Sequence, residues 1–165
     1  MSPLTLTLFW SWVKVNGPKV DVITSRGDKW LGGKDFDRWI LNYLFPENKQ
    51  TNSLLKAAEK LKCKLSDNNL SDTKVIKQEV ITEKDKDIKS LALTKIQLNE
   101  LLHQKGLFKS LNKLWEQTLA QGRSNGYELE DLTGVVIVGG GSRIPIIQKW
   151  ILQKVGPEKL LTPPP

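Results

Sequence analysis

Hydrophobic and polar residues alternate over the first dozen positions of the chain. One side of an extended strand there carries Leu4, Leu6, Leu8, Trp10 and Trp12. Such alternation predicts a strand with one apolar face. The turn sequence Asn16-Gly17-Pro18 and a second apolar run at 20–25 follow, so we expect a β-hairpin.

Helical spacing of apolar residues recurs further along the chain. A glycine loop is predicted at 27–33. Five helices are predicted: one from about Lys34 to before Pro46, and four at 51–66, 95–104, 107–121 and 145–155. The clearest is 51–66, whose apolar stripe consists of Leu54, Ala57, Ala58, Leu61 and Leu65. Thr94 is a suitable N-cap for the third helix.

Three further stretches predict strands: 73–81 and 87–93, joined by a charged turn, and the short apolar run GVVIV at 134–138. The order of elements is ββα–αββαα–βα, which indicates the α/β class. We expect the outer pieces to share one sheet, with residues of about 38–106 inserted between them as an α+β unit.

Composition narrows the choice of function. The 165 residues are 39% hydrophobic and 26% charged, and the net charge of +7 is spread along the chain without a basic block. We therefore expect no nucleic-acid partner. The single cysteine and single histidine exclude an internal disulfide and a Cys/His zinc site, and a cytoplasmic location follows as the default. No apolar run reaches the ~20 residues of a membrane span, so no membrane partner is expected.

The stretch VVIVGGGSRIPIIQKW at 135–150 carries the first candidate chemistry. Glycines after a strand let a flat ligand approach the backbone, and the next helix offers unpaired N–H groups. Arg143 would stack on a base or pair with an anion. The spacing is neither the dinucleotide fingerprint nor a P-loop. A tight strand-to-helix turn explains the same residues without a ligand.

The helix at 51–66 carries the second candidate. At ~100° per residue, one arc opposite the leucine stripe holds Glu59, Lys62, Cys63 and Ser66. A carboxylate, an ammonium group and a hydroxyl line up there. A solvated face with an i,i+3 ion pair is the alternative interpretation.

Three motifs in order resemble the nucleotide-binding domain of the seventy-kilodalton heat-shock chaperones, the DnaK family. GDKWLGGKDFD matches the family's G-D-x-x-L-G-G-x-D-F-D from Gly27 to Asp37. AAEKLKCKLS matches E-x-x-K-x-x-L-S from Glu59 to Ser66, and VVIVGGGSRIPIIQ matches the adenosine motif from Val138 to Pro145.

The resemblance implies half of an actin-like (ribonuclease H-like) ATPase domain. Residues 1–37 and 107–165 would form its sheet-bearing subdomain, and 38–106 the smaller inserted α+β subdomain that closes over the base.

The resemblance also implies binding of ATP or ADP. Adenine would be backed by Gly139, Gly140 and Gly141, with Arg143 stacked on it. On the opposite side, the ribose and base edge would be reached by Glu59, Lys62 and Ser66, with Cys63 on the same base-facing arc. Gly33 and Lys34 would lie near the sugar.

Departures from the family pattern weaken the expected site. The family usually has serine at Gly141 and arginine at Cys63, and often glutamate at Lys34. Its first phosphate loop and catalytic lysine belong to the other lobe. A second phosphate loop, of the type D-x-G-G-G-T, is expected before the first strand, yet residues 1–20 contain no Asp or Glu. Because phosphoryl transfer needs Mg²⁺ held near carboxylates, we expect neither Mg²⁺ binding nor ATP hydrolysis.

The resemblance thus predicts a chaperone-like lobe that is not an enzyme and binds adenine nucleotide at most weakly. The alternatives are an interaction module, which docks a nucleotide-exchange factor or self-associates, and a gene fragment without an independent role.

Overall fold

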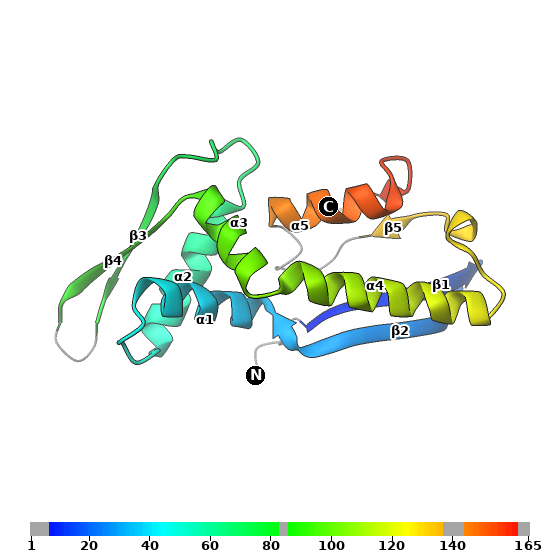
Figure 1. Ribbon diagram of the computed structural model, residues 1–165, viewed down its shortest axis with the longest axis horizontal. Coiled ribbons are helices and arrows are strands. Elements are labelled where there is room, and N and C mark those ends of the chain that lie inside the picture. The colour runs from blue at the N-terminus through cyan, green and yellow to red at the C-terminus, as the bar shows by residue number, and fades with distance from the viewer. Residues whose placement is uncertain (1–6, 83–85, 137–143, 162–165) are drawn as a thin grey trace.

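The computed structural model describes residues 7–82, 86–136 and 144–161, which form helices and small sheets in a mixed α/β arrangement (Figure 1). The strands are β1 (Thr7–Asn16), β2 (Lys19–Gly32), β3 (Ile76–Ile81), β4 (Ile88–Leu93), β5 (Val135–Val136) and β6 (Leu160–Leu161). The α-helices are α1 (Gly33–Leu44), α2 (Asn52–Leu65), α3 (Lys95–Gln104), α4 (Leu107–Ser124) and α5 (Pro145–Val155), and a 3-10 turn, η1, covers Leu129–Asp131.

The predicted N-terminal hairpin is confirmed. Strands β1 and β2 pair antiparallel up to Asn16 opposite Lys19, and Gly17 between them has a φ of +59°, which glycine adopts without strain. The glycine loop predicted at 27–33 is wrong, because β2 continues to Gly32 with Gly27 opposite Phe9. Glycine also tolerates extended backbone, and β1 pairs with this segment at Gly27, Asp28 and Gly32, with a register shift between the last two.

The predicted helices are confirmed, with small shifts at their ends. Helix α3 begins after Thr94, whose hydroxyl accepts from the backbone N–H of Gln97, while the Gln97 side chain accepts from the Thr94 N–H. Helix α5 begins at Pro145, as its fixed φ favours. Helix α4 runs to Ser124 rather than ending near Gln121.

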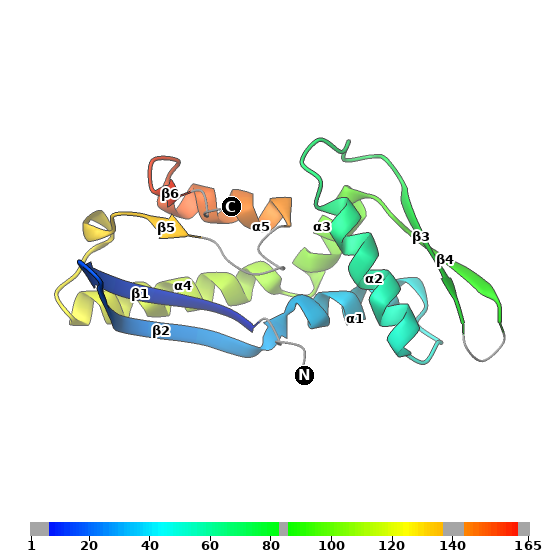
Figure 2. The same cartoon turned by 180° about the vertical axis from the view of Figure 1, so that it is seen from behind.

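The expected single sheet of the outer pieces is not what the described residues show. Strands β1–β2, β3–β4 and the parallel pair β5–β6 form three separate two-stranded sheets. Helix α4 packs along the hairpin in both views, and α5 lies on the other side of α4 (Figures 1 and 2). A helix therefore covers the hairpin, and no pairing with β5 is seen within the described ranges.

The described elements gather towards two ends of an elongated molecule. Helices α1–α3 and the β3–β4 hairpin lie at one end, while α4, α5, β1–β2 and β5–β6 lie at the other (Figures 1 and 2). The division into residues 38–106 and the remainder stays a prediction.

One apolar cluster runs through both ends. Its fully buried members include Phe36, Ile40, Leu61, Leu91, Leu102, Leu107, Ile144 and Ile147. The hairpin joins it through Trp12, whose ring lies against Gly122 of α4. A Cβ at Gly122 would lie 2.6 Å from Trp12 Cε3, so glycine is needed there for α4 and β1 to approach each other.

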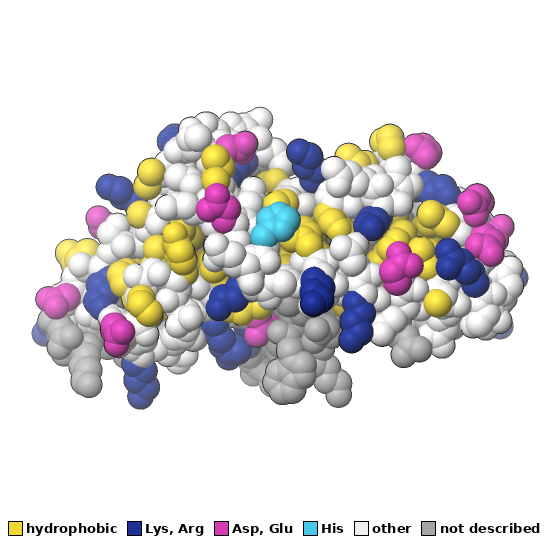
Figure 3. All heavy atoms as spheres, in the orientation of Figure 1, with side chains coloured by type: hydrophobic (Ala, Val, Ile, Leu, Met, Phe, Trp, Pro, Cys, Tyr) yellow, Lys and Arg dark blue, Asp and Glu magenta, His cyan; other side chains and the backbone are white. Residues whose placement is uncertain are grey.

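The surface carries its basic charge in a dispersed form. On the face shown in Figure 3, Lys and Arg side chains are spread along the length of the molecule, and the single histidine, His103, is exposed among them. Among the described helices, none is both long and apolar enough to cross a membrane.

Candidate functional site

Helix α2 is the element that presents most of the candidate residues. It begins after Thr51, whose hydroxyl accepts from the Leu54 backbone N–H at 3.3 Å. The predicted apolar stripe is confirmed, because Leu54, Ala57, Ala58, Leu61 and Leu65 are all buried. The stripe fixes which side of the helix faces the core and which side is left to solvent.

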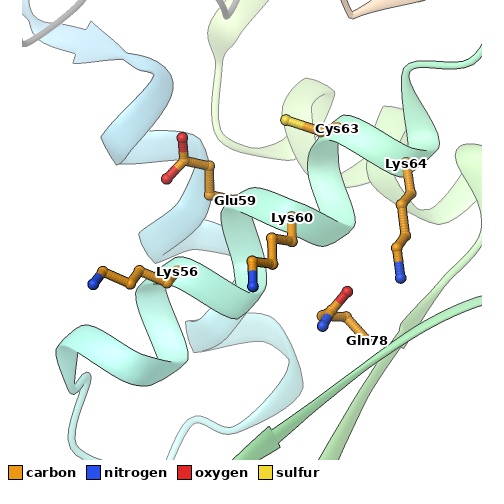
Figure 4. A pocket seen from close by; sticks show the side chains of 6 residues that line it. All are labelled: Lys56, Glu59, Lys60, Cys63, Lys64 and Gln78. Carbon is orange, nitrogen blue, oxygen red and sulfur yellow. The ribbon is translucent and has the colours of Figure 1, made fainter.

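Glu59 and Cys63 lie one turn apart on the exposed side of α2. They line an open groove of about 480 Å³ together with Lys56, Lys60, Lys64 and Gln78. Figure 4 shows Glu59 and Cys63 pointing to one side of α2, and Lys60 and Lys64 to the side of Gln78 on β3. The predicted placement of Glu59 and Cys63 on a polar face is confirmed, as is the accessibility of Cys63.

Lys62 does not share that exposed face, so its predicted place on the arc is wrong. It is buried, and its Nζ donates to Asp37 Oδ1 on α1 at 2.7 Å, with both side chains only 8% exposed. At ~100° per residue, Lys62 lies about 40° from Ala58, on the border of the apolar stripe. Helix α1 packs over that border and encloses the ammonium group.

Among the described residues around this site, the Asp37 carboxyl has a pKa that departs from its ordinary value. Burial raises the pKa of Asp37 above its ordinary value, and the negative charges of Glu59 and Asp35 add to the rise. The hydrogen bond and positive charge of Lys62 act in the opposite direction but do not cancel it. Desolvation of the two buried charges therefore offsets a large part of the attraction between Lys62 and Asp37.

Ser66 is the C-cap residue directly after α2 and is half-buried. Its hydroxyl donates to the backbone carbonyl of Lys62 at 2.9 Å, which satisfies one of the last carbonyls of the helix. The same oxygen keeps the capacity to accept a hydrogen bond from a ligand.

The first motif meets the second through α1. Gly33 is the first residue of this helix, and Lys34 is exposed in its first turn. Asp35 pairs with Arg38 on the helix surface at 3.7 Å, whereas Asp37 points inward to Lys62.

The glycine motif lies outside the described residues, so the structure does not place Gly139, Gly140, Gly141 or Arg143. The elements on its two sides are those predicted, the strand β5 before it and α5 after it, and Ile144 next to α5 is buried in the core. Within the described ranges, no group of three or more Asp, Glu, His or Cys side chains is arranged to hold a metal ion.

Comparison with known proteins decides the family. The family model described as "Hsp70 protein" matches residues 7–162. The chain belongs to the Hsp70 family. The match spans nearly all 165 residues and contains all three motifs, in the order in which the Hsp70 resemblance places them.

Sequence reasoning missed some residues of the candidate site in this Hsp70-family chain. It named Asp37 only as the end of a motif, although an aspartate inside an otherwise apolar helix face is a signal of a buried partner. It also passed over Lys56 and Lys60, which lie with Lys64 at i,i+4 spacing on one row of α2 beside Glu59 and Cys63.

Proposed function

We propose that this chain acts as a chaperone nucleotide-binding lobe that binds the adenosine end of ATP or ADP weakly and does not hydrolyse ATP. The observation that carries the proposal is the exposed pair Glu59 and Cys63, which lines a groove on α2 in an Hsp70-family chain. Cytoplasmic location and chaperone-related function belong to the same proposal.

The chemistry of the groove fits a nucleoside. The carboxylate of Glu59 accepts hydrogen bonds from ribose hydroxyls, as acidic residues do in other nucleotide sites. The three lysines of the groove suit the negative charge of a nucleotide. The glycine motif, with Gly139, Gly140, Gly141 and Arg143, would supply the opposite wall, and Gly33 and Lys34 would lie on the sugar side.

The proposal assigns no catalytic residue to the chain. Transfer of the γ-phosphoryl group needs donors around the phosphates and carboxylates for Mg²⁺. The motif that would supply them before β1 is not found in residues 1–20, which lack Asp and Glu. A half-open groove also leaves much of a nucleotide in water, which limits affinity.

Isothermal titration tests this proposal. Adenosine and ATP are expected to bind no more tightly than about 1 mM, equivalent to ~4 kcal/mol, and Mg²⁺ is expected to leave the affinity for ATP unchanged. Glu59→Gln should weaken adenosine binding about fivefold, for the loss of ~1 kcal/mol of hydrogen bonding. Glu100→Gln, an exposed change on α3, is the matched control. Micromolar binding that requires Mg²⁺ would contradict the proposal.

A second candidate function is that of an interaction module. The hairpin exposes Val13, Val15 and Val22, at 41%, 62% and 64%, and Val13 is directly opposite Val22 across the strands. Such a patch favours association with another protein, either a second copy or an exchange factor. Light scattering tests the self-association alternative, since a chain that remains monomeric at high concentration does not use the patch to bind a second copy.

A further inference from the structure

The ion pair between Lys62 and Asp37 connects the first motif to the second. Asp37 is the last residue of GDKWLGGKDFD, and Lys62 lies within the motif on α2, 25 positions further along. Both side chains are enclosed between α1 and α2, with 2.7 Å between Nζ and Oδ1. The family resemblance instead directs Lys62 towards the ribose.

The two roles of Lys62 compete. To reach a ligand outside the junction, its ammonium group would have to move away from a carboxylate that is itself buried. A hydrogen bond to a neutral hydroxyl is weaker than a charge-assisted one, and a buried carboxylate without its cation is strongly unfavourable. Replacing the Asp37 carboxylate by a ribose hydroxyl as the partner of Lys62 is therefore unfavourable, and Lys62 stays with Asp37.

The position of Lys62 affects the orientation of its neighbours on α2. Glu59 lies three residues before it and Cys63 directly after it, both on the exposed side, and Ser66 donates to its carbonyl oxygen. Together with the buried apolar stripe, which sets the side of α2 that faces the core, the hydrogen bond from Lys62 to Asp37 fixes the rotation of α2 about its own axis. This rotation sets the direction in which Glu59 and Cys63 point.

We propose that Asp37 is a positioning residue of the adenosine site, which acts through Lys62 to fix the face of α2 that carries Glu59 and Cys63. Lys62 itself makes no direct contact with the ribose. The proposal rests on the proposed function, whose site it deepens.

Two variants test the proposal. Asp37→Glu keeps the charges and leaves Lys62 intact but displaces the carboxylate by one methylene group, and Asp35→Glu makes the same change on the surface of α1 as the matched control. The double variant Asp37→Val with Lys62→Met replaces both charged side chains by apolar ones of similar total size. Two quantities are measured: the dissociation constant for adenosine, and the rate at which a thiol reagent labels Cys63 without adenosine.

We expect Asp37→Glu to weaken adenosine binding about threefold or more and to alter the labelling rate, while Asp35→Glu leaves both unchanged. The double variant should bind adenosine within about twofold of the unmodified chain. A folded double variant whose binding is lost would identify Lys62 as a ligand and overturn the proposal. If the double variant does not fold, Asp37→Glu alone decides. A dissociation constant and a labelling rate equal to those of Asp35→Glu would then overturn the proposal.

Failure of the proposed function gives a different result. In that case the unmodified chain shows no adenosine binding, and the labelling of Cys63 remains as the readout. A labelling rate changed by Asp37→Glu but not by Asp35→Glu then supports the positioning of α2 by Asp37, and equal rates overturn it.

Discussion

Lys62→Met is expected to lower the free energy of unfolding by about 3–5 kcal/mol at neutral pH. The change leaves the Asp37 carboxylate buried at 8% exposure without the cation that lies 2.7 Å from it. Urea denaturation followed by circular dichroism measures the loss. Lys60→Met, on the exposed side of the same helix, is the matched control and should change the free energy by no more than ~0.5 kcal/mol. Equal values for the two variants would show that the ion pair is not buried in solution.

The pH dependence of this effect has a defined sign. The pKa of Asp37 in the folded chain lies above its ordinary value of 3.8, so the folded state holds the proton more tightly than the unfolded state does. The contribution of Asp37 to stability is therefore greatest below pH 3.8 and is lost as the pH rises through the folded pKa. Removal of Lys62 raises this pKa further, because both influences that lower it come from Lys62. The decrease in the free energy of unfolding caused by Lys62→Met should therefore become smaller as the pH falls from neutral towards 4.

Phe36→Ala is expected to be as damaging, with a loss of about 3–5 kcal/mol in the free energy of unfolding. Phe36 is fully buried, with its ring centre 5.3 Å from that of Trp39, and it precedes Asp37 on α1. Its removal leaves a cavity in the apolar core that α1 covers. Tyr43→Ala removes an aromatic ring that is 49% exposed from the same helix and should cost no more than ~1 kcal/mol.

Thermal and urea unfolding of the two variants are compared directly. A Phe36→Ala chain as stable as the Tyr43→Ala chain would mean that the motif residue Phe36 is not part of the core. Packing in the core would then not be the reason why this motif contains a phenylalanine.

Local patterns were sufficient to predict most of the elements. The stripe from Leu54 to Leu65 and the cap at Thr51 define α2 within the chain itself, and the same holds for Thr94 and Gln97 at α3. These signals depend on residues three or four positions apart, which the sequence displays directly. The turn at Gly17 is a signal of the same local kind.

Contacts between distant segments were not predictable from such patterns. The segment 27–32 continues β2 beside β1, which pairs with it at both ends across a register shift. The burial of Lys62 depends on Asp37, 25 positions away. From the helix alone, Lys62 is a surface lysine next to Glu59, since its spacing does not reveal that α1 covers the border of the stripe. The place on the exposed arc of α2 was therefore predicted correctly for Glu59 and Cys63 and wrongly for Lys62, and the binding of a nucleotide there stays a prediction.

Protection of Cys63 by adenosine is the most direct measurement of the central claim, which is that adenosine occupies the exposed face of α2. Because Cys63 is the single cysteine of the chain and is exposed, a thiol reagent reports on this face alone. The labelling rate should fall in proportion to the fraction of chain that has bound adenosine, over a millimolar range of adenosine concentration, and the same concentrations of ribose should have less effect. Labelling that stays unchanged when adenosine saturates the chain would contradict the claim.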